Sequence, residues 1–408
     1  MKCRQCGTVL EQPFIDLGSA PPSNSYLTAE ALNGPETYFP LRVLVCNACW
    51  LVQTEDHAGR EALFTHDYAY FSSTSSSWLA HAKSYVTDMQ KRFALNETSR
   101  VVEVAANDGY LLQYVKQLGI PCYGIEPTAS TASAAREKGI EIVEQFFGVE
   151  LARTLVAEGK QADLTAANNV LAHVPDMNDF VSGFAILLKP AGVATFEFPH
   201  FLKLVRYCQF DTIYHEHYSY LSLIAVKAAF EANGLTVFDV EELSTHGGSL
   251  RVFAQREGGP HQVTSNVARV LDEEHADGIT DASFYEGFQA RAEKVKDDFV
   301  SFLIDAKQQG LKVAAYGAAA KGNTLMNFAG IRPDLLPYVV DRAAAKQGKF
   351  MPGSRIPIVD EAHMQKDRPD RIVILPWNIK DEVIAQLAYT REWGARFVTA
   401  VPQLEVSE

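Results

Sequence analysis

The sequence lacks several features that would assign it to a large class at once. It has no run of about 20 apolar residues, which excludes a membrane-spanning helix. It has 37 basic residues against 50 acidic ones and a formal net charge of −13. Non-specific nucleic-acid binding needs a surplus of Lys and Arg, so we expect none. The start, Met1-Lys2-Cys3-Arg4, lacks the apolar run of a signal peptide, and we expect a cytoplasmic protein.

What the chain does contain is ordinary for a globular protein. Of its 408 residues, 47% are hydrophobic, 21% are charged and 11% are aromatic. This composition excludes a disordered or fibrous chain. At roughly 150 residues per domain, the length predicts two or three domains. An anionic substrate remains compatible with the negative net charge, provided that a local basic pocket receives it.

Cysteine is scarce but patterned. Six occur, and four of them form two Cys-x-x-Cys pairs, Cys3/Cys6 and Cys46/Cys49. Each pair places two thiolates on one tight turn, and two such turns supply the tetrahedral site that Zn²⁺ prefers. The alternative is two disulfides, which a cytosolic protein seldom keeps. We predict a structural zinc ion, because four thiolates leave no open position for a catalytic water.

Apolar patterns divide the chain into three regions. Residues 1–65 form a zinc-binding module and linker. Residues 66–285 open with a Tyr- and Ser-rich stretch, then alternate strands and helices, which predicts a doubly wound parallel sheet. Residues 286–408 predict a second Rossmann-like α/β domain. The expected strands are 41–45, 101–105, 122–125, 164–167, 194–198, 313–316, 338–341 and 371–375. The expected helices are 78–93, 110–118, 130–138, 181–188 and 284–309.

The first strand of the central region ends in a turn typical of nucleoside binding. In the run VVEVAANDGYLL, residues 101–112, Gly109 opens a helix. Glu126 ends the next strand, where an acid binds ribose hydroxyls. Ala105 and Asn107 replace the first two glycines that a dinucleotide pyrophosphate needs, so S-adenosylmethionine (SAM), which has no phosphate, fits better. A dinucleotide and a merely well-packed turn remain alternatives. The candidate cofactor residues are Glu103, Ala105, Asn107, Asp108, Gly109, Glu126, Asn168 and Asn169.

The densest polar cluster is YHEHYSY, residues 214–220. Histidine is the side chain most easily poised as a base near pH 7. Glu216 is suited to orient a histidine or to act as the base itself. A His-x-His metal site and an exposed polar turn are the alternatives. Downstream, His246-Gly247-Gly248 forms a loop whose glycines permit close backbone approach to a substrate.

The third region contains a strand followed by a turn of small residues, YGAAAKGNT, residues 316–324. A helix N-terminus offers free N–H groups and a positive dipole end, and Lys321 adds a charge. A diphosphate would fit this turn. The alternative is a tight strand–helix turn with a solvated lysine.

Together, these motifs resemble the sugar C-methyltransferases that act on nucleotide-linked keto-deoxysugars. In that family a four-cysteine zinc module precedes a SAM-binding domain and a C-terminal Rossmann-like domain. The resemblance runs from Cys3 to about Val401. One departure is Ala105, where the family usually has glycine; alanine fits this turn if its φ is negative. The matching motifs are the four cysteines, Tyr68–Ser73, Asn107–Gly109, Tyr214–His217, His246–Gly248 and Tyr316–Lys321.

The resemblance implies methyl transfer from SAM to a carbon beside a ketone, through an enolate. C3 of a nucleoside-diphosphate 4-keto-6-deoxysugar is the usual target. By resemblance His217 is the base and Glu216 its partner. Tyr68 and Tyr214 donate to the enolate or orient the sugar. The nucleotide lies between the two α/β domains. The implied substrate residues are Tyr70, Ser72, His246, Gly247, Gly248, Tyr316 and Lys321.

Three other functions stay open at this point. A SAM-dependent O-methyltransferase would leave the polar cluster without a special purpose. An NAD-dependent oxidoreductase would need a three-glycine turn, which residues 317–321 lack. A zinc-containing binding module would show no turnover. The sequence does not distinguish thymidine from guanosine diphosphate, and it shows no apolar stripe for self-association, so we expect a monomer.

Overall fold

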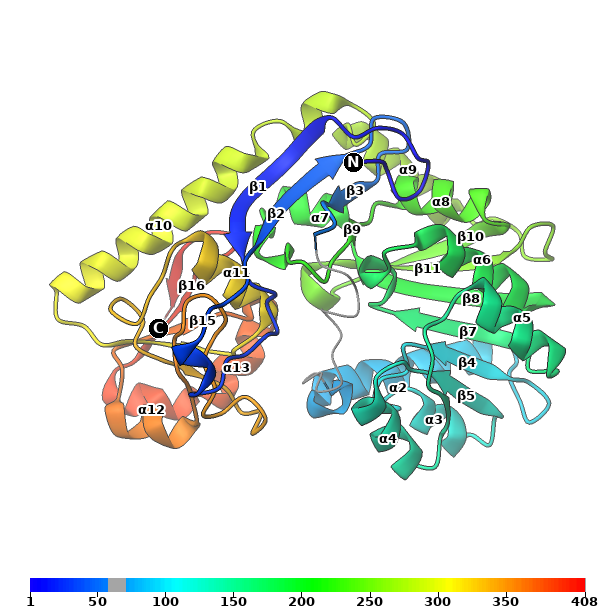
Figure 1. Cartoon of the computed structure of the whole chain (residues 1–408). Helices are drawn as coiled ribbons and strands as arrows, with labels where there is room; N and C mark the ends of the chain where they lie inside the picture. The colour runs from blue at the N-terminus through cyan, green and yellow to red at the C-terminus, as the bar shows by residue number, and fades with distance from the viewer. Residues whose placement is uncertain (58–70, 408) are drawn as a thin grey trace.

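The computed structural model describes residues 1–57 and 71–407. Three sheets organise these residues, and in Figure 1 an N-terminal hairpin lies between two larger α/β lobes. Among the described helices, none is both long enough and apolar enough to cross a bilayer.

The smallest sheet has four antiparallel strands in the order β1-β2-β3-β9. The predicted strand before the second cysteine pair is confirmed, because β2 ends at Val45, immediately before Cys46. The fourth strand, β9, comes from much later in the chain. The strands are β1 (Gln12–Ala20), β2 (Phe39–Val45), β3 (Val52–Thr54) and β9 (Ser219–Tyr220).

The central sheet has seven strands in the order β10-β11-β8-β7-β4-β5-β6. Strands β4 to β8 are parallel, as predicted, while β10 and β11 form an antiparallel edge. The strands are β4 (Val101–Val104), β5 (Cys122–Ile125), β6 (Glu141–Val143), β7 (Ala162–Asn168), β8 (Leu188–Pro199), β10 (Leu235–Leu243) and β11 (Ser249–Arg256).

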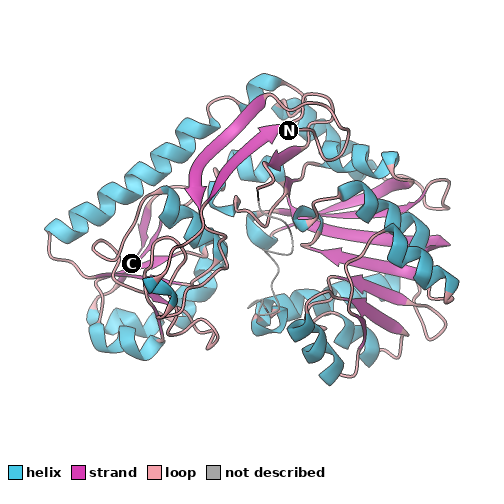
Figure 2. Ribbon diagram, in the orientation of Figure 1, coloured by secondary structure: helices cyan, strands magenta, loops and turns pink. Residues whose placement is uncertain are grey.

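Helices cover both faces of the central sheet (Figure 2). Apolar side chains of α2 and α3 pack on one face, and those of α5, α6 and α8 pack on the other. The sheet is therefore doubly wound, as the strand–helix alternation predicted. The helices are α2 (Ser76–Arg92), α3 (Leu112–Gln117), α4 (Ala129–Glu137), α5 (Val149–Ala157), α6 (Met177–Leu187), α7 (Phe201–Arg206), α8 (Leu223–Ala232) and α9 (Ser265–Asp277).

The third sheet has six strands in the order β14-β13-β12-β15-β16-β17, parallel except for β17. One face packs on α10 and α11, and the other packs on α12 and α13. The elements are α10 (Phe288–Gln308), β12 (Val313–Tyr316), α11 (Ala320–Phe328), β13 (Val339–Val340), β14 (Ile358–Val359), α12 (Glu361–Asp367), β15 (Arg371–Ile374), α13 (Lys380–Gln386), β16 (Arg396–Thr399) and β17 (Glu405–Ser407).

One hydrophobic core joins the three parts. This core contains apolar side chains from β1 and β2, from the segment 201–213, and from α10 and β12. At its centre the ring of Phe14 stacks on Phe288 with centroids 4.4 Å apart and meets Phe201 edge-on at 5.3 Å. Because this shared core is close-packed, it fixes the segment before residue 214 against both neighbouring parts.

Candidate functional site

The four paired cysteines converge on one point. Their sulfur atoms all lie within 4.8 Å of one another, with Cys3 Sγ 3.6 Å from Cys49 Sγ and Cys6 Sγ 3.5 Å from Cys46 Sγ. A tetrahedron of Zn–S bonds of 2.3 Å has edges of about 3.8 Å, whereas a disulfide needs about 2.05 Å. The donor set and spacing fit Zn²⁺, so the zinc prediction is confirmed and the disulfide alternative is excluded.

The turn after β4 is more strained than expected. Ala105 has φ +60°, Asn107 +49° and Gly109 +75°. The amides of Ala105 and Ala106 both donate to the Ile125 carbonyl, at 2.8 and 3.1 Å, which forces the tight bend. The expectation that Ala105 adopts a negative φ is therefore wrong. The left-handed conformation costs an alanine about 1 kcal/mol that a glycine avoids.

Glu126 closes this turn from the neighbouring strand. One carboxylate oxygen accepts the Asn107 amide and the other accepts the Thr128 amide, both at 2.9 Å. Burial raises the pKa of Glu126, and it raises that of Glu103, on β4, well above its usual range. Glu126 is thereby held rigid at the end of β5, at the position predicted for a ribose contact.

Several buried polar atoms around the turn find no hydrogen-bond partner in the described part of the chain. They include Oδ1 of Asn169 and Oδ1 of Asp108, while the side chains of Glu103 and Asn168 lie beside the Tyr110 hydroxyl. Leaving such groups unsatisfied is costly unless a ligand completes them. SAM carries an ammonium group and ribose hydroxyls that match these acceptors. The residues present therefore fit that cofactor.

The serine-rich stretch lies on the cofactor turn. The Ser72 amide donates to Asn107 Oδ1 at 2.9 Å, and the Ser73 amide donates to Asp108 Oδ2 at 3.3 Å. The Ser72 backbone thus lies against the predicted cofactor turn, and its contact with the substrate stays a prediction. Tyr68 and Tyr70, also predicted for the site, lie outside the described residues.

His217 is held as a neutral imidazole. Its Nδ1 donates to the Thr212 carbonyl at 2.8 Å, which leaves the lone pair on Nε2. Burial, with the nearby His173 ring second, lowers the pKa of His217 well below its usual range. The Tyr214 ring lies 3.9 Å from the imidazole centroid, and the His173 ring meets it edge-on at 4.6 Å. The ring is oriented and unprotonated, as a proton acceptor must be.

The Glu216 side chain meets a residue from far away in the sequence. Its carboxylate is buried and accepts Asn24 Nδ2 at 2.8 and 2.9 Å. The orienting contact on His217 Nδ1 comes from the Thr212 carbonyl, and the role of Glu216 as partner of His217 stays a prediction. Asn24 was not predicted, because no local pattern signals a contact between residues so far apart in the chain. Two residues on, Tyr26 donates to the Ala318 carbonyl at 2.6 Å.

Lys321 brings a partly buried positive charge close to His217. It lies in the first turn of α11, where Nζ donates to Asn378 Oδ1 at 3.0 Å and lies 4.7 Å from the Trp377 ring centroid. Trp377 Nε1 in turn donates to Asp211 Oδ2 at 2.7 Å, next to Thr212. Burial lowers the pKa of Lys321, while the Asp211 charge opposes that shift. In the described chain no carboxylate lies within 4 Å of this ammonium group.

The predicted glycine loop joins the cofactor side to the third sheet. His246, with φ +54°, accepts Asn169 Nδ2 at Nε2 over 3.1 Å. Burial lowers its pKa to about 4, so the ring is neutral. At Gly247, φ is +85° and a Cβ atom would lie 2.5 Å from Trp377; at Gly248 it would lie 2.8 Å from Lys203. Both positions require glycine for space as well as conformation.

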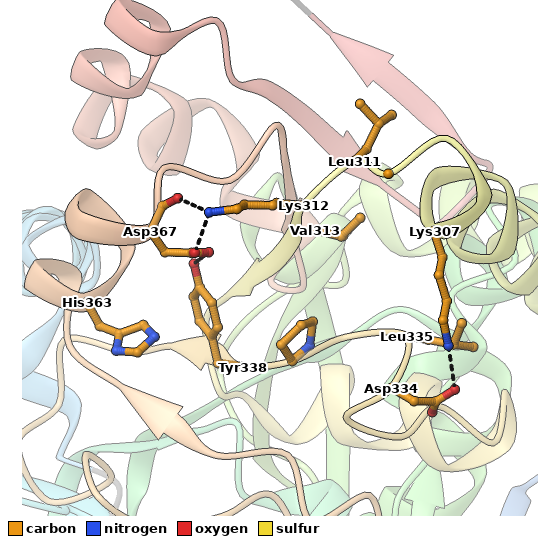
Figure 3. Close-up of a pocket in the computed structure, with 11 residues that line it drawn as sticks. Lys307, Leu311, Lys312, Val313, Asp334, Leu335, Tyr338, His363 and Asp367 are labelled. Atoms are coloured by element: carbon orange, nitrogen blue, oxygen red, sulfur yellow. Dashed lines mark hydrogen bonds and ion pairs between the residues drawn. The ribbon is translucent and has the colours of Figure 1, made fainter.

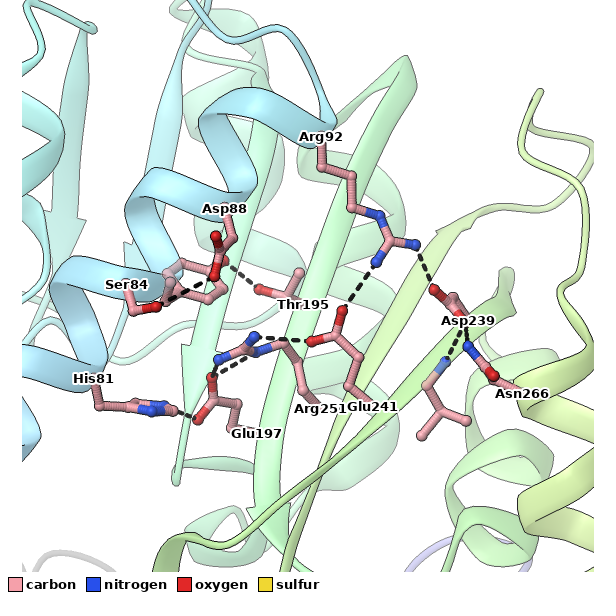
Figure 4. Close-up of polar contacts among 12 residues, drawn as sticks. His81, Ser84, Asp88, Arg92, Thr195, Glu197, Asp239, Glu241, Arg251 and Asn266 are labelled. Carbon is pink, nitrogen blue, oxygen red and sulfur yellow. Dashed lines mark hydrogen bonds and ion pairs between the residues drawn. The ribbon is translucent and has the colours of Figure 1, made fainter.

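A polar network behind this loop fixes helix α2 (Figure 4). Glu197, on β8, accepts His81 Nε2 at 2.8 Å and Arg251 Nε at 2.7 Å. Burial would raise the pKa of Glu197, but these partners lower it. The anchored helix carries Trp78, whose ring lies 5.5 Å from that of His246. None of these contacts was predicted.

Tyr316 lies on the opposite face of the third sheet from Lys321. Its hydroxyl donates to Glu361 Oε1 at 3.3 Å, and its ring belongs to the core cluster between the third sheet and α12 and α13. Because side chains alternate across a strand, Tyr316 faces away from α11 and Lys321. The structure therefore does not bring this predicted substrate residue together with Lys321.

A separate pocket lies at the opposite, amino edge of the third sheet (Figure 3). Its charges are already matched, because Lys307 pairs with Asp334 at 3.2 Å and Lys312 pairs with Asp367 at 2.8 Å. Ligands of such sheets bind at the carboxyl ends of the strands. This pocket is therefore not the candidate site.

Three family models match successive parts of this chain. A putative zinc binding domain matches residues 3–64, a methyltransferase domain matches 78–240, and a C-methyltransferase C-terminal domain matches 244–402. The chain is 34% identical over 405 residues to the C-methyltransferase NovU of Streptomyces niveus, which covers 99% of this chain and 96% of that protein.

Other similarities are confined to part of the chain. A ubiquinone biosynthesis O-methyltransferase of Bordetella avium is 30% identical over 95 residues, 23% of this chain and 39% of that protein. The SAM-bound crystal structure of magnesium protoporphyrin IX methyltransferase from Synechocystis aligns with a TM-score of 0.34 and 18% identity. That alignment covers 44% of this chain and 79% of that one.

Proposed function

This chain belongs to the C-methyltransferase family that includes NovU, with SAM as the methyl donor, and we propose that its acceptor is a nucleoside-diphosphate 4-keto-6-deoxysugar. The methyl group goes to a carbon beside the ketone, most directly C3. The observation that carries this proposal is the position of His217. Its neutral, oriented imidazole meets His173, in the loop after β7, and lies near enough to Lys321, in the first turn of α11, for that charge to lower its pKa.

The base is needed because a carbon beside a ketone is not a nucleophile until it loses a proton. In the proposed reaction His217 Nε2 takes that proton, and the electron pair of the C–H bond moves onto the carbonyl oxygen to form an enolate. When bound, SAM supplies a methyl group already activated by its sulfonium. A positioned base typically contributes about 10²–10⁴-fold to the rate. The Tyr214 hydroxyl and the unassigned Tyr68 remain proposed donors to the sugar or the enolate.

Lys321 is the proposed partner of the diphosphate. It is a partly buried cation with a neutral acceptor, Asn378 Oδ1, at the first turn of a helix whose N-terminus favours an anion. Asn323, two residues on, is fully buried, and its amide has no partner among the described residues. Both features favour an anionic ligand at this end of α11. His246, Gly247 and Gly248 remain proposed sugar or nucleotide contacts, because they lie between Asn169 and Trp377.

We propose residues 1–65, 66–285 and 286–408 as the functional units. In support, each sheet draws its strands from one of these ranges, except that β9 of the central range completes the N-terminal sheet. The zinc-binding, cofactor and nucleotide parts thus meet at the segment between α7 and β9.

The test is the release of S-adenosylhomocysteine with a panel of thymidine- and guanosine-diphosphate 4-keto-6-deoxysugars. We expect turnover with at least one of them, and a product whose new methyl group is bonded to the carbon beside the ketone, as located by NMR. A methyl group found on oxygen would replace this proposal with O-methylation. Binding of SAM without turnover on any keto sugar would reject the acceptor class.

A further inference from the structure

The zinc-binding module contacts the backbone of the catalytic loop directly. Strand β3 pairs with β9, so that Val52 faces Tyr220 and Gln53 faces Ser219. Just before that pair, the Thr54 amide donates to the Tyr218 carbonyl at 3.1 Å. Three consecutive residues after the proposed base are therefore hydrogen-bonded to, or paired with, one short strand of another module.

The base itself takes part in this contact. Thr54 Oγ1 donates to the backbone carbonyl of His217 at 3.2 Å. The opposite side of the loop is fixed within the central part, where the Tyr218 amide donates to the Ala172 carbonyl at 2.8 Å. The backbone of His217 is consequently clamped from two sides, and one of the two clamps belongs to the zinc-binding module.

Arg4 connects this clamp to the metal ligands. It lies inside the first knuckle, between Cys3 and Cys6, so a bound zinc ion fixes its backbone. Its guanidinium donates to the Tyr218 carbonyl and to the Thr54 carbonyl, the latter at 3.3 Å from Nη2. The same group lies 5.2 Å from the Tyr218 ring centroid. One side chain thus donates hydrogen bonds to two carbonyls, one on each side of the β3–β9 pair.

Gln53 makes a second connection. Its Oε1 accepts the Arg4 amide at 3.0 Å, and its Nε2 donates to Cys3 Sγ at 3.2 Å. The Gln53 side chain is fully buried. Such partners of a metal ligand fix its orientation, and their loss typically costs 10–100-fold in affinity or activity. The thiolate, Arg4 and the loop backbone therefore form one connected set of hydrogen bonds.

We propose that Arg4 is a positioning residue for methyl transfer: the zinc knuckle, through the Arg4 guanidinium, sets the backbone position of the loop that carries His217. Zinc in this protein then has a function beyond the stability of its own module, because it organises the proton-transfer step from outside the active site. The inference rests on the proposed function only in naming His217 as the base.

The test compares Arg4→Gln with Arg4→Lys in the full-length, zinc-loaded protein. Arg42→Gln is the matched control, because the exposed Arg42 lies on β2 of the same module and pairs with Glu55 at 2.7 Å, away from residues 214–220. For each variant we would measure the zinc content, the SAM dissociation constant, kcat on the best keto sugar, and amide hydrogen exchange of residues 214–220.

We expect Arg4→Gln to keep one zinc ion per chain and SAM affinity within about twofold, since its cysteines are intact. Its kcat should fall by about 10–100-fold, because a displacement near 1 Å at the reacting centre has that effect. Amides of residues 214–220 should exchange faster. Arg4→Lys should recover part of both losses, and Arg42→Gln should show neither.

Normal kcat and normal exchange in Arg4→Gln would overturn the proposal. So would loss of zinc or of the folded state in step with activity, because Arg4 would then serve only its own module. If instead His217→Asn retained turnover, the assignment of the base would fail on its own, while the exchange comparison would still report whether Arg4 positions the loop.

Discussion

The central and third sheets are built alike at their carboxyl edges but carry opposite chemistry. In each, an acid at the end of the second strand accepts the amide of the turn that follows the first strand. Glu126 accepts the Asn107 amide at 2.9 Å, and Asp341 accepts the Ala318 amide at 2.8 Å. The fold thus repeats the same backbone device twice, and the difference lies in the side chains added to it.

Around Glu126 the additions are unsatisfied amide and carboxylate groups, which suit the hydroxyls and positive charge of SAM. Around Asp341 they are lysines: Lys346 lies 3.5 Å from that carboxylate, and Lys321 begins the following helix. The comparison teaches that this fold sets where a ligand binds, while the first few residues after each strand set its charge. The predictions below break or sharpen this division.

The largest effect is expected at His217, where the SAM-binding and sugar-binding parts are proposed to meet. His217→Asn keeps a donor for the Thr212 carbonyl but removes the base. We expect kcat to fall by about 10²–10⁴-fold, with binding of both ligands nearly unchanged. Single-turnover kinetics and calorimetric titration of SAM check this. Near-normal turnover would assign the base to another group, with Glu216 the first to examine.

Lys321→Met tests the proposed diphosphate site at the third sheet. Removing the ammonium group should raise KM for the nucleotide sugar by about 10-fold or more, since charge-assisted contacts contribute about 1.5–3 kcal/mol, and leave SAM affinity unchanged. Because burial disfavours the charged form of Lys321, the melting temperature should not fall. Lys380→Met, at a surface ion pair with Glu405, is the control. Equal weakening of both ligands would contradict the division.

Glu126→Ala tests the proposed SAM site at the central sheet. Here SAM affinity should fall while the KM for the sugar stays nearly unchanged. Loss of the carboxylate frees the Asn107 and Thr128 amides and removes the proposed ribose contact, so SAM should bind about 10-fold more weakly. The KM for the sugar should stay within about twofold. Glu144→Ala, at the surface pair with Arg136, is the matched control. A change confined to sugar affinity would reverse the assignment of the two sheets.

The pH dependence should be flat near neutrality. His217 acts only when unprotonated. Burial lowers its pKa well below the usual range, and the nearby His173, Lys321 and His246 side chains lower it further. The neutral form therefore persists as the pH falls, and the acid limb of kcat/KM should lie below pH ~6.5, the ordinary histidine value. A midpoint at or above that value would mean that the base is exposed or is another group.

The smallest effect concerns the turn itself. Ala105→Gly removes a methyl group from a residue at φ +60°, so the melting temperature should rise by a few degrees at most, corresponding to about 1 kcal/mol. SAM affinity should change little. Thermal unfolding with and without SAM checks both expectations. A clear loss of stability would show that the Ala105 methyl group packs usefully despite its backbone conformation.

Local patterns predicted the local parts of this protein well. The Cys-x-x-Cys spacing fixes each knuckle, and the apolar runs of β4, β5 and β12 mark buried parallel strands before any tertiary contact is known. The departures have physical causes. Tyr316 was assigned by its motif, although strand alternation turns it to the opposite face of the sheet. Ala105 follows a bend imposed by the Ile125 carbonyl.

Long-range contacts were the part that the sequence could not give. Asn24 meets Glu216 across a sequence separation of 192 residues, Thr212 holds His217 through its backbone carbonyl, and Trp377 reaches Asp211 from the third α/β part. Every residue has a backbone carbonyl, so the residue type does not indicate which carbonyl accepts a hydrogen bond from His217. Asparagine and tryptophan at single positions have no periodic signal, so only the folded chain identifies them.

The central claim is that His217 removes a proton from the carbon beside the sugar ketone. The most direct measurement is deuterium incorporation into the best keto sugar in D₂O, without SAM, by the wild-type enzyme and by His217→Asn. The account predicts incorporation at one carbon beside the ketone with the wild type, and its loss in the variant while the sugar still binds. Incorporation at an undiminished rate in His217→Asn would contradict it.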